Sequence, residues 1–337
     1  MARPYYIFSN GRLKRKENTI RIETQNGKKD IPVEEVAAIY VFGEMDLNSK
    51  LLNFLSQHEI PLHIYNYYGF YAGSYLPRER NVSGELLVRQ VKHYLDKEKR
   101  FYLAFTFVEG AIFHILRNLR SYHDTEGFKR KIEQELNKAC EVKKLNELMG
   151  CEGRARSVYY QAFSNMLKPE EFVMEKRERR PPTNPVNALI SFGNSLIYTT
   201  VLSEIYKTPL NPTISYLHEP RERRYSLSLD IAEIFKPLMV DAIILKLINN
   251  NMLKLSDFDA DVNYCYLNEN GRRKFITEYE KKLTTTIKHR KLKRKVSYRS
   301  LIRIECYKLI KHLLGDDVYK PFKAWWWNGL CDCYLRY

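Results

Sequence analysis

Two hydrophobic periods divide the chain into an early and a late part. Residues 1 to about 75 contain short runs typical of β-strands, such as the alternating Thr19–Glu23 and the continuously apolar Val36–Phe42. Asn10-Gly11 and Asn26-Gly27 tolerate positive φ and therefore predict tight turns. We expect the early part to consist of strands and one short helix, capped by Asn48.

From Gly84 onward, apolar residues recur with a period near 3.6, which predicts amphipathic helices. The segment 76–84 contains Pro77 and several charges, which is typical of a linker. We therefore expect an α+β protein: a small, sandwich-like β domain over residues 1–75, this linker, and a larger all-α catalytic domain over residues 85–337. The helical patterns cover residues 86–95, 101–119, 128–148, 152–166, 184–205 and 228–249, with two more after Asn268.

The charge balance favours an anionic partner. The chain has 337 residues, with 56 Lys and Arg against 40 Asp and Glu, so its formal net charge is +16. Such an excess favours nucleic acid first and a membrane surface second. The 25 tyrosines suit stacking on bases, although many of them will be core residues. Six scattered cysteines lack zinc-site spacing, and no apolar run approaches the roughly 20 residues of a membrane span. We expect a cytoplasmic protein with reduced thiols.

The stretch from His218 to Glu233 combines groups that bind metal ions and phosphates. The imidazole of His218 and the carboxylates of Asp230 and Glu233 flank three arginines. Carboxylates with a histidine suit Mg²⁺ or Mn²⁺, and arginines suit phosphate. On a helix, two acids three residues apart project to the same side. The combination predicts metal-assisted chemistry on a nucleic-acid backbone, although a lone histidine is usually a surface or core residue and Asp230 also suits a helix start.

Glu152 is a further candidate, at the expected start of a helix whose buried stripe includes Ala155 and Tyr159. A glutamate in a first turn also compensates the helix dipole, so Glu152 alone indicates little. Its sequence context indicates more, because four spaced blocks follow one another along the chain. They are Glu152-Gly153-x-Ala155-x-x-x-Tyr159, then Arg180-Pro181-Pro182-x-Asn184-Pro185-x-Asn187-Ala188-Leu189-x-Ser191-Phe192-Gly193, then Leu217-His218, and then Leu229-Asp230-Ile231-x-Glu233-x-Phe235-x-Pro237.

Together these blocks resemble the CRISPR-associated integrase family known as Cas-one, over essentially the whole chain. The resemblance implies a metal-dependent DNA endonuclease and integrase, which inserts short foreign DNA fragments into a CRISPR array by transesterification during CRISPR adaptive immunity. In the family a glutamate, a histidine and an acidic residue hold Mg²⁺ or Mn²⁺, and these map onto Glu152, His218 and Glu233. The third ligand is often aspartate in the family, and glutamate leaves oxygen ligation intact.

Three further residues are assigned to the surroundings of this site. Asp230 matches a neighbouring acidic position of the family, and we expect it to orient the ligands, with direct ligation as the alternative. Tyr198 lies where some relatives place a tyrosine near the site, and core packing is its alternative. Asn187 is expected either to tie down the histidine loop or to cap the helix that follows Asn184.

The resemblance also implies the partners: double-stranded DNA as protospacer and CRISPR repeat, a second copy of the chain bound through the β domain, and a small protein, Cas-two, that bridges two dimers. Two rival functions stay open, a non-catalytic nucleic-acid-binding protein and a general metal nuclease on branched or single-stranded DNA. A basic run is often only a solvated helix end. With DNA as substrate, the expected backbone contacts are Arg221, Arg223 and Arg224 in the histidine loop, and Lys288, Arg290, Lys291, Lys293, Arg294 and Lys295 further on.

Overall fold

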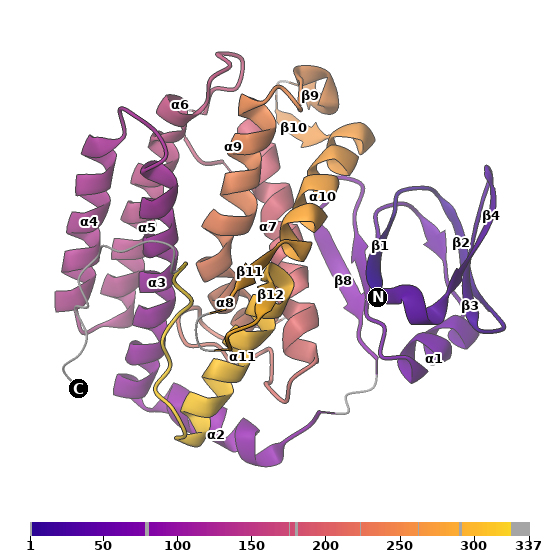
Figure 1. Cartoon of the computed structure of the whole chain (residues 1–337), viewed down its shortest axis with the longest axis horizontal. Helices are drawn as coiled ribbons and strands as arrows, with labels where there is room; N and C mark the ends of the chain where they lie inside the picture. Colours follow the sequence, from indigo (N-terminus) through magenta and orange to yellow (C-terminus); the bar gives the residue numbers. More distant parts are fainter. Residues whose placement is uncertain are drawn as a thin grey trace. The chain divides into compact units, whose positions relative to one another are not determined.

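The computed structural model describes residues 2–77, 81–174, 176–178, 181–222, 224–261, 263–289 and 292–324. The chain divides into two compact units, Met1–Val82 and Ser83–Tyr337, both drawn in Figure 1. The first unit is built mainly from strands and the second mainly from helices, so the predicted change from strands to helices along the chain is confirmed.

Two four-stranded sheets form the first unit. One has the strand order β1-β5-β7-β8 and is parallel except for the last pair. The other has the order β4-β3-β2-β6, with antiparallel pairs among β2, β3 and β4. The elements are β1 (Arg3–Ile7), β2 (Gly11–Lys16), β3 (Thr19–Thr24), β4 (Gly27–Pro32), β5 (Val36–Val41), β6 (Met45–Asp46), α1 (Ser49–Gln57), β7 (Leu62–Tyr65) and β8 (Tyr71–Tyr75), with a 3₁₀ turn at Val33–Glu35.

Apolar side chains of both sheets and of α1 share one core, which makes the unit sandwich-like. Leu13 and Leu62 come from different sheets, Leu51 comes from α1, and all three are fully buried. The pair Asn26-Gly27 turns β3 into β4, with Gly27 at a φ of 128°. Asn10-Gly11 does not close a hairpin, because β1 and β2 belong to different sheets.

Long helices pack side by side in the second unit (Figure 1). The longest are α3 (Lys97–Leu119) and α7 (Pro185–Tyr206), and most residues of both are buried. Helix α7 is apolar on almost every side, as expected of a helix inside a helical core. The other helices are α2 (Gly84–Leu95), α4 (Glu126–Glu141), α5 (Leu145–Gln161), α6 (Phe163–Met166), α8 (Ser226–Lys236), α9 (Ala242–Asn249), α10 (Glu269–Thr284) and α11 (Tyr298–Leu314), with a 3₁₀ turn at Leu255–Asp257.

The expectation of an all-α second domain is wrong, because this unit also contains two short antiparallel hairpins. One pairs β9 (Phe258–Asp261) with β10 (Tyr264–Leu267), and the other pairs β11 (Thr286–Lys288) with β12 (Lys295–Ser297). Strands of three or four residues are too short to give a recognisable alternation. Within the described ranges, no helix is both long enough and apolar enough to cross a membrane.

The helix that carries Glu152 starts earlier than predicted. The sequence pattern places a helix end near Leu148 and a new start at Glu152. Instead, α4 ends at Glu141, residues 142–144 are not helical, and α5 runs from Leu145 without interruption. Gly150 therefore lies inside a helix, where glycine is tolerated at some loss of stability. Glu152 is the eighth residue of α5, so compensation of the helix dipole in the first turn does not explain it.

A π-helical turn, Pro237–Asp241, joins α8 to α9. Pro237 has no N–H, so the regular helical ladder is interrupted there. The Asn118 side chain of α3 donates a hydrogen bond to the Pro237 carbonyl, 2.8 Å away, and a second one to the Tyr159 hydroxyl of α5. Such turns recur at functional sites, and this one follows the helix that carries Asp230 and Glu233.

Candidate active site

The predicted catalytic residues come from α5, from α8 and from the loop between α7 and α8. Glu152 lies on α5, Glu233 on α8, and His218 in the loop. Helix α8 packs against α3 and α7, and the charge of Glu233 acts on the His218 ring. The histidine loop and α8 therefore meet within the helical unit.

Asp230 organises the histidine loop. Its fully buried carboxylate accepts backbone hydrogen bonds from Tyr216 and Leu217 on one oxygen, at 2.6 and 3.0 Å. The other oxygen accepts the His218 backbone N–H at 3.0 Å and the His218 ring Nδ1 at 2.8 Å. With Nδ1–H donated to Asp230, the neutral ring presents Nε2 as its acceptor or metal ligand.

The same carboxylate changes the acidity of the histidine. Burial lowers the pKa of His218, but the hydrogen bond and negative charge of Asp230, together with the charge of Glu233, raise it above its usual value of 6.5. The imidazole is therefore a stronger base than a free one. It keeps a proton more readily, and a cation at Nε2 would have to displace that proton.

Arg156 joins the two predicted acidic ligands. Its Nε donates to Glu152 at 2.6 Å, one turn earlier on the same helix, and its Nη2 donates to Glu233 on α8. Lys236 donates to the other carboxylate oxygen of Glu233. Burial would raise the pKa of Glu233, but Arg156 and Lys236 hold it well below its usual range. Both acids thus lie beside one guanidinium group.

A cation-binding geometry is not formed in this side-chain arrangement. Among the described residues, no three His, Cys, Asp or Glu side chains are close enough to hold a metal ion together. Arg156 and Lys236 use the carboxylate oxygens that a cation would need. The donor set nevertheless fits a hard divalent cation in kind, with two carboxylates and an imidazole whose second nitrogen is already hydrogen bonded.

Asp241, at the end of the π-helical turn, is a further acid beside this cluster. It is 1% exposed, and burial raises its pKa to about 7 even though Arg156 and Lys236 lower it. Sequence analysis missed Asp241, Arg156 and Lys236. The spacings of Arg156 four residues after Glu152 and of Lys236 three residues after Glu233 were available signals of ion pairs. For Asp241 the available signal was weaker: a single acidic residue within an otherwise apolar stretch.

The two residues assigned to the surroundings contact different segments. The Tyr198 hydroxyl accepts the backbone N–H of Tyr225, just before α8. The Asn187 side chain does not hold the histidine loop; it bonds Arg177, the Glu178 N–H and the Lys176 carbonyl. The capping side chain of α7 is Asn184. Asn187 thus fixes residues 176–178, and the charge of Arg177 reaches Asp241.

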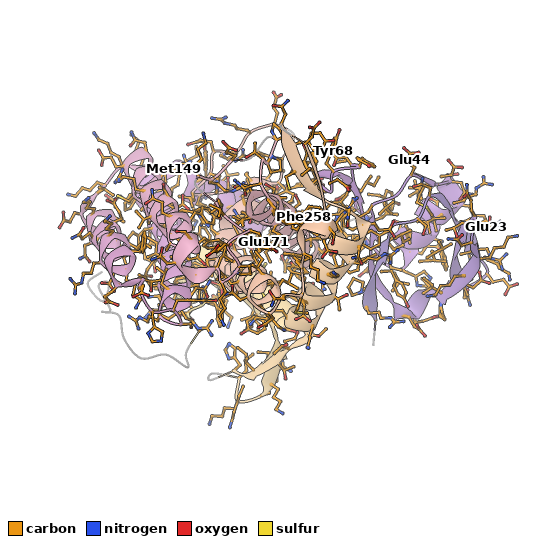
Figure 2. All side chains as sticks on the ribbon, turned by 90° about the horizontal axis from the view of Figure 1, so that it is seen from above. Glu23, Glu44, Tyr68, Met149, Glu171 and Phe258 are labelled. Atoms are coloured by element: carbon orange, nitrogen blue, oxygen red, sulfur yellow. The ribbon has the colours of Figure 1, made fainter. Side chains whose placement is uncertain are left out.

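The predicted DNA-contact residues fall in two places. In the histidine loop, Arg221 is exposed and Arg224 is half-buried. The second place is the β11–β12 hairpin, which projects from the helical unit (Figure 2). Just beyond its strand pairs, the His289 N–H donates to the Arg294 carbonyl at 2.8 Å. Lys288, Lys293, Arg294 and Lys295 are exposed there, whereas Arg223, Arg290 and Lys291 lie outside the described residues.

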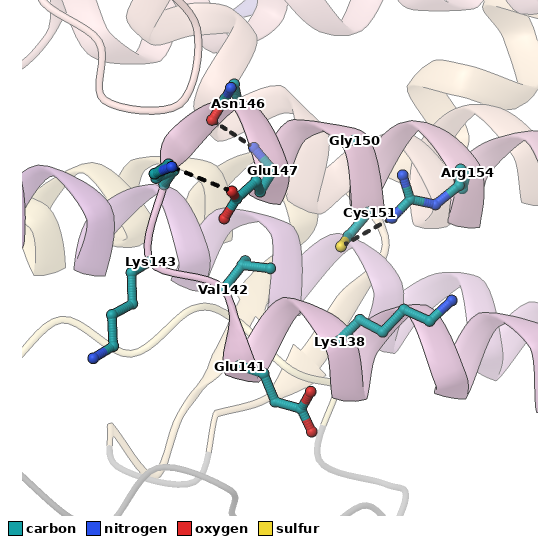
Figure 3. Close-up of a pocket in the computed structure, with 10 residues that line it drawn as sticks. Lys138, Glu141, Val142, Lys143, Asn146, Glu147, Gly150, Cys151 and Arg154 are labelled. Atoms are coloured by element: carbon teal, nitrogen blue, oxygen red, sulfur yellow. Dashed lines mark hydrogen bonds and ion pairs between the residues drawn. The ribbon is translucent and has the colours of Figure 1, made fainter.

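A surface hollow lies at the junction of α4 and α5. Its lining includes the residue before Glu152 but not Glu152 itself. Cys151, which precedes Glu152, lines this hollow and accepts a hydrogen bond from Arg154 at 3.3 Å (Figure 3). Glu152 instead bonds Arg156, which reaches α8. The hollow and the acidic site thus use neighbouring residues of α5 that have separate partners. The remaining lining residues are Lys138, Glu141, Val142, Lys143, Lys144, Asn146, Glu147, Gly150 and Arg154.

A strand-built unit followed by a helical unit with an acid–histidine cluster is the arrangement expected of the CRISPR-associated integrase family. Residues 5–281 match the model of the CRISPR associated protein Cas1 family. The chain is 70% identical over 325 residues, covering 96% of this chain and 100% of the relative, to the "CRISPR-associated endonuclease Cas1 3" of Thermodesulfovibrio yellowstonii. It belongs to the Cas1 family, which confirms the resemblance described above.

Solved structures agree with this assignment. A Cas1 protein from Thermotoga maritima superposes with a TM-score of 0.86 at 45% identity, covering 94% of this chain and 98% of that one. A casposase bound to its integration product has the same fold, with a TM-score of 0.83 at 21% identity, covering 96% of this chain and 94% of that one.

Proposed function

We propose that the protein is a divalent-metal-dependent DNA endonuclease and integrase of CRISPR adaptation, which joins short DNA fragments to a CRISPR repeat by transesterification. Membership of the Cas1 family supports the biological role. The observation that carries the chemistry is the arrangement of Glu152 and Glu233, held by one guanidinium beside a histidine whose Nδ1 is already bonded. A cation would bind the two acids in place of their basic partners and would also use Nε2 of the imidazole.

In this proposal Glu152 and Glu233 hold Mg²⁺ or Mn²⁺ through carboxylate oxygens, and His218 through Nε2. The bound cation would supply Lewis acidity, stabilising negative charge that develops on the phosphoryl oxygens. Asp230 fixes the histidine tautomer and the path of the loop. The reaction exchanges one phosphodiester for another, since a 3′-hydroxyl attacks the phosphorus and the former 3′-oxygen leaves. It therefore needs no further reactant.

Basic residues would bind the DNA backbone on either side of the chemistry. Arg221 is exposed in the histidine loop, which supports a contact with phosphates near the reacting one. Lys288, Lys293, Arg294 and Lys295 of the β11–β12 hairpin would contact a more distant part of the duplex. Contacts of this kind position DNA without reading its sequence.

The proposed partners follow from the family. We propose a homodimer formed through the strand-built unit and a complex with the small protein Cas2, which would place two active sites at the two ends of one DNA fragment. Light scattering of the purified chain tests the dimer. Co-elution with a Cas2 protein tests the larger complex.

A strand-transfer assay tests the activity. Purified protein is incubated with a 3′-hydroxyl duplex and supercoiled repeat DNA, with Mn²⁺ or with EDTA. Covalent joining of the two DNAs only with Mn²⁺ is the expected result. Metal-dependent nicking alone would favour a general nuclease, and DNA binding that survives EDTA without joining or nicking would favour a non-catalytic binding protein.

A matched pair of variants on one helix makes this assay specific. Glu152→Gln is expected to abolish joining while it leaves DNA binding intact. Glu147→Gln changes an exposed acid in the first turn of the same helix, whose ion pair with Lys144 spans 3.9 Å, and is expected to join DNA normally. Normal joining by Glu152→Gln would refute the assignment.

A further inference from the structure

Asp241 is a buried acid that the proposed reaction leaves without a role. It is the last residue of the π-helical turn and is almost fully buried, yet neither carboxylate oxygen accepts a hydrogen bond from the described part of the chain. A buried polar group without a partner is unfavourable, so such an arrangement in a folded protein calls for an explanation. Arg156, Lys236 and Arg177 all act electrostatically on it. Asp241 therefore lies beside the cationic groups of the candidate site.

Arg156 has an unused donor in the same region. Its Nε and Nη2 bond Glu152 and Glu233, whereas its Nη1 is buried without an acceptor among the described residues. A guanidinium carries five N–H donors and keeps its charge in proteins. Arg156 is thus a permanently charged, buried group that interacts with three acids, of which only Asp241 accepts no hydrogen bond.

A divalent cation and Arg156 would compete for the same oxygens. The proposed ligands Glu152 and Glu233 each use a carboxylate oxygen to bond Arg156. Once a cation takes these oxygens, the guanidinium faces a second positive charge and loses its acceptors. Leaving a buried charge unpaired is strongly destabilising, so Arg156 needs another carboxylate nearby.

We propose that Arg156 is a positioning residue with different carboxylate partners in two states: it holds Glu152 and Glu233 together in the cation-free protein, and it moves to Asp241 when a divalent cation binds. Arg156 already interacts electrostatically with Asp241, so a rotation of its side chain is the movement that the exchange requires. The exchange explains why a buried acid without hydrogen bonds lies next to a metal site. It rests on the metal site of the proposed function.

Manganese affinity tests the exchange without any reference to DNA joining. Titration of Mn²⁺ into the full-length protein, followed by electron paramagnetic resonance of the free ion, gives the dissociation constant. Asp241→Asn keeps the shape but removes the charge that Arg156 needs, so the affinity is expected to fall about tenfold, as for other residues that support metal ligands. In the Arg156→Gln background the same change is expected to have no effect, because no guanidinium then has to be accommodated.

Three comparisons decide the outcome. Unchanged affinity in Asp241→Asn, or an equal loss in both backgrounds, overturns the inference while leaving the metal site in place. Failure of the unmodified protein to bind Mn²⁺ overturns both. Asp257→Asn is the control, since Asp257 is also buried but its carboxylate bonds Lys274 and Asn270; it should lower the melting temperature and leave the affinity unchanged. If Arg156→Gln does not fold, Arg156→Met, which also removes the charge, replaces it, and Asp241→Asn should again have no effect.

Discussion

His218 and Asp230 form one unit, in which ring Nδ1 lies 2.8 Å from a carboxylate oxygen that also accepts the histidine's own backbone N–H. The second carboxylate oxygen accepts two more backbone N–H groups of the same loop. One buried acid therefore determines both the path of the loop and the nitrogen that its histidine presents. Loss of this acid should affect folding and chemistry together.

Asp230→Asn is expected to lower the free energy of unfolding by roughly 2–4 kcal/mol, because an amide group would point N–H bonds at buried N–H donors. Urea denaturation measures the change. Glu219→Gln is a suitable control, since Glu219 is in the same loop but pairs with Arg100 at a partly exposed position. An Asp230→Asn protein as stable as the original would show that the loop is held by other contacts.

His218 should titrate above an ordinary histidine. Its pKa is raised by Asp230 and Glu233 against the opposing effect of burial. A raised pKa in the folded state means that the ion pair adds stability fully below pH 6.5 and loses it as the pH rises through the folded pKa. The ring carbon resonances in an NMR titration measure the midpoint. A midpoint at or below 6.5 would contradict the Asp230 hydrogen bond in solution.

The pKa of His218 also sets a pH dependence for cation binding. Below that pKa both ring nitrogens carry protons, so Nε2 cannot act as a ligand. Manganese affinity is expected to rise with pH until His218 is neutral and then to level off. His218→Gln, which does not titrate, should bind weakly at every pH. The same slope in this variant would assign the pH dependence to another group.

Asp241 should make the protein less stable as the pH rises. Burial raises its pKa to about 7 from 3.8, so the folded state binds a proton that the unfolded state releases between these values. Stability from this group is complete below about pH 4 and declines up to about pH 7. Asp241→Asn is expected to be more stable than the original at pH 8, by roughly 1–3 kcal/mol, and equal to it at pH 4.

Asp257 is the control for Asp241, because its pKa shift has the opposite direction. The pKa of Asp257 is lowered by Lys274 and by backbone and side-chain hydrogen bonds, in spite of burial. Its contribution to stability is therefore present above pH 3.8 and lost as the pH falls, so Asp257→Asn should destabilise the protein at pH 8. Thermal denaturation of both variants at pH 4 and pH 8 gives the comparison. Destabilisation by Asp241→Asn at pH 8 would show that the carboxylate has a partner in solution.

His114 ties the segment before residue 325 to the helix of the acidic site. Its Nδ1 donates to the Ile234 carbonyl at 2.9 Å, and its Nε2 accepts the Ala324 N–H at 3.3 Å. Burial lowers its pKa to about 3, so its contribution to stability is present above pH 6.5 and is lost as the pH falls. Hydrogen exchange of the Ala324 amide should therefore speed up between pH 6.5 and 4, after correction for the intrinsic rate, and His114→Phe should remove that dependence.

The sequence pattern identifies the two parts of the chain and its longest helices because these depend on period alone. The predicted helix 184–205 is observed as Pro185–Tyr206, where Asn184 caps the first turn and Pro185 suits its first position. The break before α5 was missed, because residues 142–144 contain no glycine or proline while Gly150 lies within the helix. Local residue types misplace a helix end when tertiary packing decides it.

For the candidate site, the sequence motifs identify the main residues but not the contacts between them. The spaced blocks point to Glu152, His218 and Glu233, but they do not reveal that Arg156 bridges two acids that are 81 residues apart in the chain, at positions 152 and 233. Nor do they identify Asp241, whose significance depends on its burial and on the cations around it. Partners from different helices become visible only once the helices are packed.

The β11–β12 hairpin should contribute to the salt dependence of DNA binding. Lys288, Lys293 and Lys295 are exposed on it, and each phosphate contact that is lost removes about 0.9 from the slope of log affinity against log salt concentration. The triple change to glutamine should therefore reduce that slope by about two to three, as measured by fluorescence anisotropy between low and moderate salt. Lys131, Lys143 and Lys144, which are exposed on α4 and its following loop, provide a control with the same loss of charge. Equal reductions in both triple variants would mean that DNA responds to net charge alone, whereas a reduction confined to the hairpin variant would place the duplex against it.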